Sequence, residues 1–167
     1  SMRTRRPVSL EVGDRLPNTL LLSGSALILA FALAVPIGVI SALYRYTLLD
    51  YVLSTLALVG ISIPVFWSAL LLLQVFAIQL DWLPASGMSS VRESYEGVAA
   101  VLDVAHHLIL PTIVLSLAQI ASLSRYQRSA LLDVLNEDYM RTAYGKGLRP
   151  RRIMLVHALR NALIPMI

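Results

Sequence analysis

Three stretches of this 167-residue chain contain no charged residue and are mostly apolar. They are residues 16–44, 51–80 and 104–124. A helix that crosses a bilayer needs about 20 apolar residues, and a charged residue near its centre costs about 2.5–3.5 kcal/mol on insertion scales. The pattern therefore predicts an all-α membrane protein with three transmembrane helices. Their predicted bounds are about 20–43, 52–78 and 107–124.

The first predicted span carries a small residue at every fourth position. These residues are Ala26, Ala30, Ala34, Gly38 and Ala42. Because residues four apart lie on one face of a helix, we expect a stripe that another helix approaches closely. Pro17 and Asn18 predict the start of this helix, with Asn18 or Thr19 as its N-cap.

The second and third spans contain residues that interrupt a helix or make it polar. Gly60, Ser62 and Pro64 lie in the middle of the second span and predict a kink there. Pro111 suits the first turn of the third span. Four polar residues are candidates for lining a substrate path, although such residues more often hydrogen-bond a neighbouring helix. They are Ser62, Thr112, Ser116 and Gln119.

The composition agrees with a membrane protein and narrows the possible chemistry. Hydrophobic residues make up 57% of the chain, charged residues 14%, and the mean hydropathy is +0.70, which excludes an ordinary soluble domain. The chain has no cysteine, so disulfides, thiolate catalysis and cysteine-based metal sites are excluded. The net charge of +4 comes from residues that flank the spans, a pattern that does not favour nucleic-acid binding.

Basic residues are divided unevenly between the two sides of the predicted membrane. Residues 1–17 and the loop after the second span contain five, whereas the first connection and the segment from Arg125 onward contain nine. The positive-inside rule then predicts a cytoplasmic C-terminal segment. The predicted layout is an extracytoplasmic segment at 1–17, a membrane region at 18–135, a cytoplasmic loop at 136–150 and the start of a further helix at 151–167.

The loop at 136–150 is predicted to contain a short helix with its own start and stop signals. Asn136 is a good N-cap, and Gly147 supplies the left-handed residue that ends many helices. Pro150 then suits the first turn of the next helix. Four residues would be available to a groove on a partner or to lipid headgroups, and the pattern alone favours neither. They are Tyr139, Met140, Ala143 and Tyr144.

The same loop resembles a sequence of a known family. The matching runs are DYMRTA at 138–143, KGL at 146–148 and HALRNALIP at 157–165. They are similar to the cytoplasmic loop of the inner-membrane permeases of ABC importers for dipeptides, oligopeptides, glutathione and nickel. Supporting runs are RLPNTL at 15–20, GISIP at 60–64 followed by FW at 66–67, and WLP at 82–84. The resemblance covers nearly the whole chain and favours the B-type subunit.

The resemblance implies a six-span type I ABC importer fold, of which this chain would hold the second, third and fourth spans, a coupling loop and the start of the fifth span. The helix in the loop would dock on an ATPase subunit and couple it to the membrane spans. The residues implied in coupling are Asp138, Tyr139, Arg141, Thr142, Ala143, Lys146, Gly147, Leu148 and His157.

The resemblance also implies the partners of the protein. They are a second homologous permease, two cytoplasmic ATPases that hold ATP and Mg, an extracytoplasmic solute-binding protein and the lipid of a bacterial or archaeal inner membrane. The chain has no G-x-x-x-x-G-K-[ST] motif, so it is expected to bind no nucleotide or other cofactor and to catalyse no reaction itself.

Two other functions remain open from the residues alone. A non-transporting anchor or assembly subunit would have the same spans. An intramembrane serine protease is a remote alternative, in which Gly60-x-Ser62 would supply the nucleophile and His107 the base. Adjacent His106 and His107 lack a carboxylate cluster, so we expect no metal site there.

Overall fold

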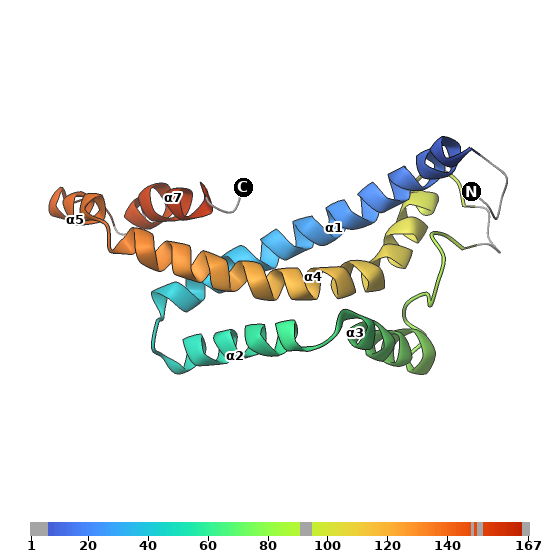
Figure 1. The fold of residues 1–167 in the computed structure, drawn as a ribbon, viewed down its shortest axis with the longest axis horizontal. Coiled ribbons are helices and arrows are strands. Elements are labelled where there is room, and N and C mark those ends of the chain that lie inside the picture. Colours follow the sequence, from blue (N-terminus) through green and yellow to red (C-terminus); the bar gives the residue numbers. More distant parts are fainter. Residues whose placement is uncertain (1–6, 91–94, 148, 150–151, 165–167) are drawn as a thin grey trace. The chain divides into compact units, whose positions relative to one another are not determined.

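The computed structural model describes residues 7–90, 95–147, 149 and 152–164, and these residues form helices and no strand. The elements are α1 (Val8–Leu43), α2 (Leu48–Ser62), α3 (Val65–Leu72), α4 (Val98–Leu135), α5 (Asp138–Gly145) and α7 (Arg160–Leu163), with π-helical segments η1 (Leu73–Gln79) and η2 (Ile153–Leu159) (Figure 1). The predicted all-α class is confirmed. By length and composition α1 and α4 can each cross a membrane, and α2 with α3 and η1 would make a third, broken span.

The long helices begin earlier than the sequence predicted. The first turn of α1 starts next to Pro7, whose carbonyl accepts from the Glu11 N–H at 3.4 Å. The predicted N-cap at Asn18 or Thr19 is therefore wrong, because the Thr19 hydroxyl donates to the Arg15 carbonyl at 3.1 Å inside the helix. Pro17 has no N–H, so the carbonyl four residues before it lacks its helical donor. Pro17 is exposed, and other polar groups can therefore reach this carbonyl.

Pro111 does not lie in a first turn. Helix α4 begins at Val98 and continues to Leu135, and Pro111 is in its interior. The alanine- and leucine-rich residues before the proline favour a helix strongly enough to extend it in this direction. The proline removes the hydrogen bond that its missing N–H would make, and its ring crowds the carbonyl four residues earlier.

The kink predicted at Gly60–Pro64 is confirmed as a complete break between two helices. Helix α2 ends at Ser62, Ile63 has an extended backbone (φ −83°, ψ 124°), and α3 begins at Val65 after Pro64. A residue that precedes proline is driven out of the helical region, which explains why the break lies at Ile63.

The chain divides into two compact units, which are described separately. The first unit contains residues 1–29 and 64–116. Within it, the Ser25 and Thr112 hydroxyls lie 2.9 Å apart and join α1 to α4. The loop after η1 is tied to α4 where Asp103 accepts from the Ser90 N–H and hydroxyl, both at 2.7 Å.

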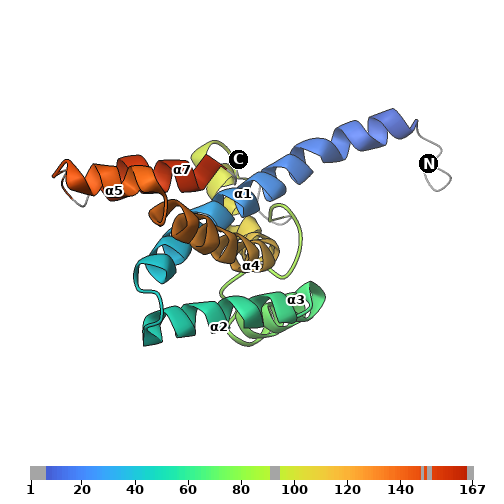
Figure 2. The ribbon, with the colours of Figure 1, turned by 60° about the vertical axis from the view of Figure 1, so that its left-hand side comes forward.

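The second unit contains residues 30–63 and 117–167. In both views, α2 lies beside the C-terminal half of α4, and α5 and α7 lie near the end of that helix (Figures 1 and 2). Helices α1 and α4 approach each other closely at Gly38, because a Cβ atom there would lie 2.6 Å from the Ser124 carbonyl oxygen and 2.7 Å from Gln127 Cβ. Only glycine fits this contact.

A buried ion pair links three elements of the second unit. The Arg128 guanidinium on α4 donates two hydrogen bonds to the Asp50 carboxylate on α2, at 2.9 and 2.8 Å. Asp50, whose side chain is 4% exposed, also accepts from the Ser41 hydroxyl on α1, from the Tyr46 N–H at 3.0 Å and from the Ser54 hydroxyl at 3.3 Å. Tyr46 has a left-handed backbone (φ 64°), so this hydrogen bond holds the turn between α1 and α2 in an uncommon conformation.

Gly38→Ala is expected to destabilise the protein by about 1–3 kcal/mol, because the added methyl group would overlap backbone and side-chain atoms of α4. The measurement is the thermal unfolding midpoint of the purified full-length protein in detergent. Gly24→Ala in the same helix is the matched control, since a Cβ there has no atom within 4 Å. Equal midpoints for the two variants would contradict the close approach.

Asp50→Asn is expected to cost about 3 kcal/mol, because it leaves the partly buried Arg128 without its counter-ion. Arg128→Gln should have a similar effect, and the double variant should lose less than the sum of the two. Chemical or thermal unfolding of the three variants measures this. Asp138→Asn, which removes an exposed ion pair, is the control and should change stability little. If the stability losses of Asp50→Asn and Arg128→Gln were additive in the double variant, a direct ion pair between the two residues would be contradicted.

Candidate functional site

Helix α5 lies directly after α4 and starts at a different residue from the one predicted. Its N-cap is Glu137, which makes no side-chain capping bond. The predicted N-cap Asn136 is wrong, because its side-chain amide donates to the Leu132 carbonyl at 3.0 Å. This amide is therefore used at the C-terminal end of α4, whose last carbonyls also need donors.

The end of α5 agrees with the sequence. The Lys146 N–H donates to the Thr142 carbonyl and the Gly147 N–H to the Tyr144 carbonyl, both at 3.0 Å. Gly147 has φ +69°, so the predicted left-handed termination is confirmed. The turn fixes where the helix stops. The predicted helix start at Pro150 lies outside the described residues.

One face of α5 is buried against its own chain. Met140 (0% exposed) and Ala143 belong to a hydrophobic cluster with Ala42 of α1, Leu131 of α4 and Ile153 of η2. The expectation that Met140 and Ala143 are available to a partner is therefore wrong. A helix of eight residues is too short to be stable alone, so it uses these residues to attach to the unit.

The opposite face of α5 and the turn after it are exposed. Six of the residues that the family resemblance implies in coupling are exposed here, and we call them the coupling surface: Asp138, Tyr139, Arg141, Thr142, Lys146 and Gly147. Of the other residues implied in coupling, Ala143 is buried, His157 is half-buried in η2, and Leu148 lies outside the described residues.

The coupling surface is positioned by contacts that leave its charges in solvent. The Tyr139 hydroxyl accepts from the Asn161 side-chain amide of α7 at 3.1 Å, which connects the exposed face of α5 to the next helix. The Thr142 hydroxyl donates to the Asp138 carbonyl within α5. Arg141 and Asp138 are 3.5 Å apart and almost fully exposed, so their ion pair contributes little to stability.

The five small residues of α1 are all buried. Gly38 contacts α4 and Ala42 lies in the cluster that holds α5, so this part of the stripe packs within the same chain. Among the polar span residues, Thr112 meets Ser25, whereas Ser62 and Ser116 donate to the Leu58 and Ile113 carbonyls of their own helices. Gln119 is half-buried.

The groups needed for a protease or a metal site are engaged elsewhere. The Ser62 hydroxyl donates to its own helix, and His107 Nδ1 lies 2.9 Å from the Asp103 carbonyl. His106 Nε2 lies 3.0 Å from the Trp82 carbonyl. Over the described part of the chain, no three His, Cys, Asp or Glu side chains group together as metal ligands would.

Residues 34–167 match the family described as "Binding-protein-dependent transport system inner membrane component". This segment contains α5, the coupling surface and most of the membrane helices.

The chain is also similar to curated proteins along its whole length. It is 43% identical to the oligopeptide transport system permease protein AppB of Bacillus subtilis over 166 residues, which cover 99% of this chain and 51% of that protein. It is 41% identical to the di/tripeptide transport system permease protein DppB of Pseudomonas aeruginosa, with 100% and 54% covered. It is 40% identical to the glutathione transport system permease protein GsiC of Salmonella typhimurium, with 100% and 50% covered. The chain thus spans about half the length of these relatives.

Met140→Ala is expected to destabilise the protein by about 2–5 kcal/mol, because it opens a cavity in the cluster that attaches α5. Tyr144→Ala, on the exposed face and 52% exposed, should leave the unfolding midpoint within the error of the wild type. Both variants are measured by thermal unfolding of the full-length protein. A larger loss for Tyr144→Ala than for Met140→Ala would reverse the assignment of the two faces.

Proposed function

This chain belongs to the family of binding-protein-dependent transport system inner membrane components, and we propose that the full-length protein is a permease subunit of an ATP-driven ABC importer. It forms half of the translocation path in the inner membrane and pairs with a second homologous permease. The observation that carries this proposal is the division of α5 into a face anchored by Met140 and an exposed coupling surface.

The proposed substrates are small peptides. The three relatives described above are named for oligopeptides, for di- and tripeptides and for glutathione, which is itself a tripeptide derivative. An extracytoplasmic binding protein delivers the peptide to the permease pair. The family name, which describes transport that depends on a binding protein, supports such a partner.

Two cytoplasmic ATPases supply the energy. Each binds ATP and Mg, and this chain, whose sequence has no phosphate-binding glycine loop of the Walker type, binds neither. Helix α5 docks in a cleft of one ATPase, with the aromatic ring of Tyr139 and the charges of Arg141 and Lys146 at the contact. The excess of basic residues on the side of the membrane that carries α5 supports a cytoplasmic position for this helix.

An ATPase that docks on α5 can move the membrane helices, because α5 is packed against them and cannot move independently. Its buried residue Met140 packs in the cluster that includes Leu131 of α4 and Ala42 of α1. When closure of the ATPases displaces α5, this close-packed cluster carries the displacement to the ends of both membrane helices. Transport then follows from a change between two packed arrangements, each coupled to the state of the ATPases.

Gly147→Arg tests the coupling role. The residue has φ +69°, where a side chain is strained, and a bulky cation would stand at the edge of the coupling surface. We expect the variant to assemble in the membrane and to continue to hydrolyse ATP. Its ATP-driven peptide uptake should fall at least about tenfold, which corresponds to a change of roughly 1.4 kcal/mol in coupling free energy. Uptake and hydrolysis are measured on the same proteoliposomes.

Two matched variants separate the backbone effect from the surface effect. Gly147→Asn tolerates the left-handed backbone and should keep uptake. Gly145→Arg adds the same cation inside α5, where a Cβ meets no atom within 4 Å, and shows whether charge alone is harmful. Normal uptake by Gly147→Arg would overturn the docking assignment.

A further inference from the structure

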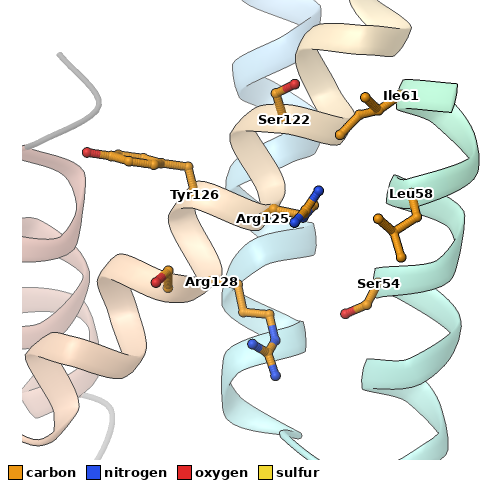
Figure 3. Close-up of a pocket in the computed structure, with 8 residues that line it drawn as sticks. Ser54, Leu58, Ile61, Ser122, Arg125, Tyr126 and Arg128 are labelled. Atoms are coloured by element: carbon orange, nitrogen blue, oxygen red, sulfur yellow. The ribbon is translucent and has the colours of Figure 1, made fainter.

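An open pocket of about 610 Å³ lies between α2 and the C-terminal half of α4, inside the second unit. Arg125 and Arg128 of α4 lie on one side of it, and Ser54, Leu58 and Ile61 of α2 face them (Figure 3). Ser122 and Ser129 on α4 also line it. No lining residue is acidic in the part of the chain that the structure describes.

The two arginines differ in their partners. Arg128 is neutralised by the bidentate contact with Asp50. Arg125 is exposed on the same face and forms no ion pair with any residue of the described ranges. An arginine without a counter-ion at the edge of a membrane helix is costly unless an anion or water reaches it. The pocket therefore presents one uncompensated cation beside several hydroxyl groups.

Polar and apolar groups are divided between the two walls of the pocket, because both arginines belong to α4 and both aliphatic residues, Leu58 and Ile61, belong to α2. Ser54 and Arg128 lie at one end, and Ile61 and Ser122 lie at the other, with Arg125 between them (Figure 3). Leu58 and Ile61 are one and two turns further along α2 than Ser54, and both remain exposed, Leu58 at 51%. A ligand that fits this arrangement has an oxyanion that reaches Arg125 on α4 and a hydrocarbon chain that lies against Leu58 and Ile61 on α2.

We propose that this pocket binds an anionic phospholipid, whose phosphate pairs with Arg125 and whose acyl chain covers Leu58 and Ile61. A small soluble anion would satisfy Arg125 but would leave the two apolar side chains uncovered. Basic pockets between membrane helices are a known kind of site for lipid headgroups, and a single basic residue near the surface contributes measurably to such binding.

The test uses the full-length protein with the subunits that accompany it, stripped of lipid in detergent. Phosphatidylglycerol is titrated into it, and bound lipid is counted by native mass spectrometry. Arg125→Gln should bind this lipid about fivefold more weakly than the wild type, the effect of losing one basic residue, whereas Arg125→Lys should keep most of the affinity. Arg45→Gln removes a cation that lies over the Tyr46 ring, outside the pocket, and should bind like the wild type.

Competition separates the lipid from other anions. Phosphatidylcholine should bind more weakly, and neither inorganic phosphate nor a peptide with a free carboxylate should displace phosphatidylglycerol, because neither covers the apolar wall. Displacement by either would assign the pocket to a soluble anion and overturn the proposal. Equal binding of phosphatidylglycerol by Arg125→Gln and the wild type would also overturn the proposal. So would a wild type that binds no phosphatidylglycerol because another part of the protein fills the pocket.

Discussion

The Asp50 carboxylate is the constraint on which the second unit depends. It accepts two hydrogen bonds from Arg128 on α4, one from Ser41 on α1, one from Ser54 on α2 and one from the Tyr46 N–H in the turn. A buried carboxylate is costly unless its lone pairs are satisfied, so all of these donors must arrive together. This requirement fixes the register of the three helices around Asp50. Arg125, three residues before Arg128 on α4, has no anionic partner among the residues that the structure describes.

A second constraint fixes the position of α5. Because Met140 is buried with Leu131, Ile153 and Ala42, the short helix is part of the core of its unit and not a loop that folds on a partner. The close contact at Gly38 holds α1 against α4 next to this cluster. Close packing of this kind has few alternative arrangements, which suits the proposed role of α5 in passing on a displacement.

Patterns within one element could be predicted from the sequence, and so could the close approach of another helix to the small-residue stripe of α1, which is confirmed at Gly38. The specific polar contacts between elements could not be predicted. Charge-free stretches indicated the helices, Gly60–Pro64 indicated the break, and Gly147 indicated the end of α5, because each depends on local backbone chemistry. The predicted helix starts at Asn18 and Pro111 were wrong, because the residues before them are helical and α1 and α4 begin earlier. The predicted N-cap Asn136 was wrong because its side-chain amide binds the end of α4. The Asp50–Arg128 pair was missed because its partners are 78 residues apart, and the burial of Met140 depends on which face meets the core.

The break between α2 and α3 determines what can surround the middle of that segment. Pro64 has no N–H, so the Gly60 carbonyl loses the donor that an uninterrupted helix would supply, and Ile63 is extended. In hydrocarbon a backbone carbonyl without a donor costs several kcal/mol, and lipid tails can offer none. This stretch of backbone must therefore be solvated, by water, by other protein groups or by whatever solute passes. The break in the helix thus exposes polar backbone groups in a segment whose side chains are almost all apolar.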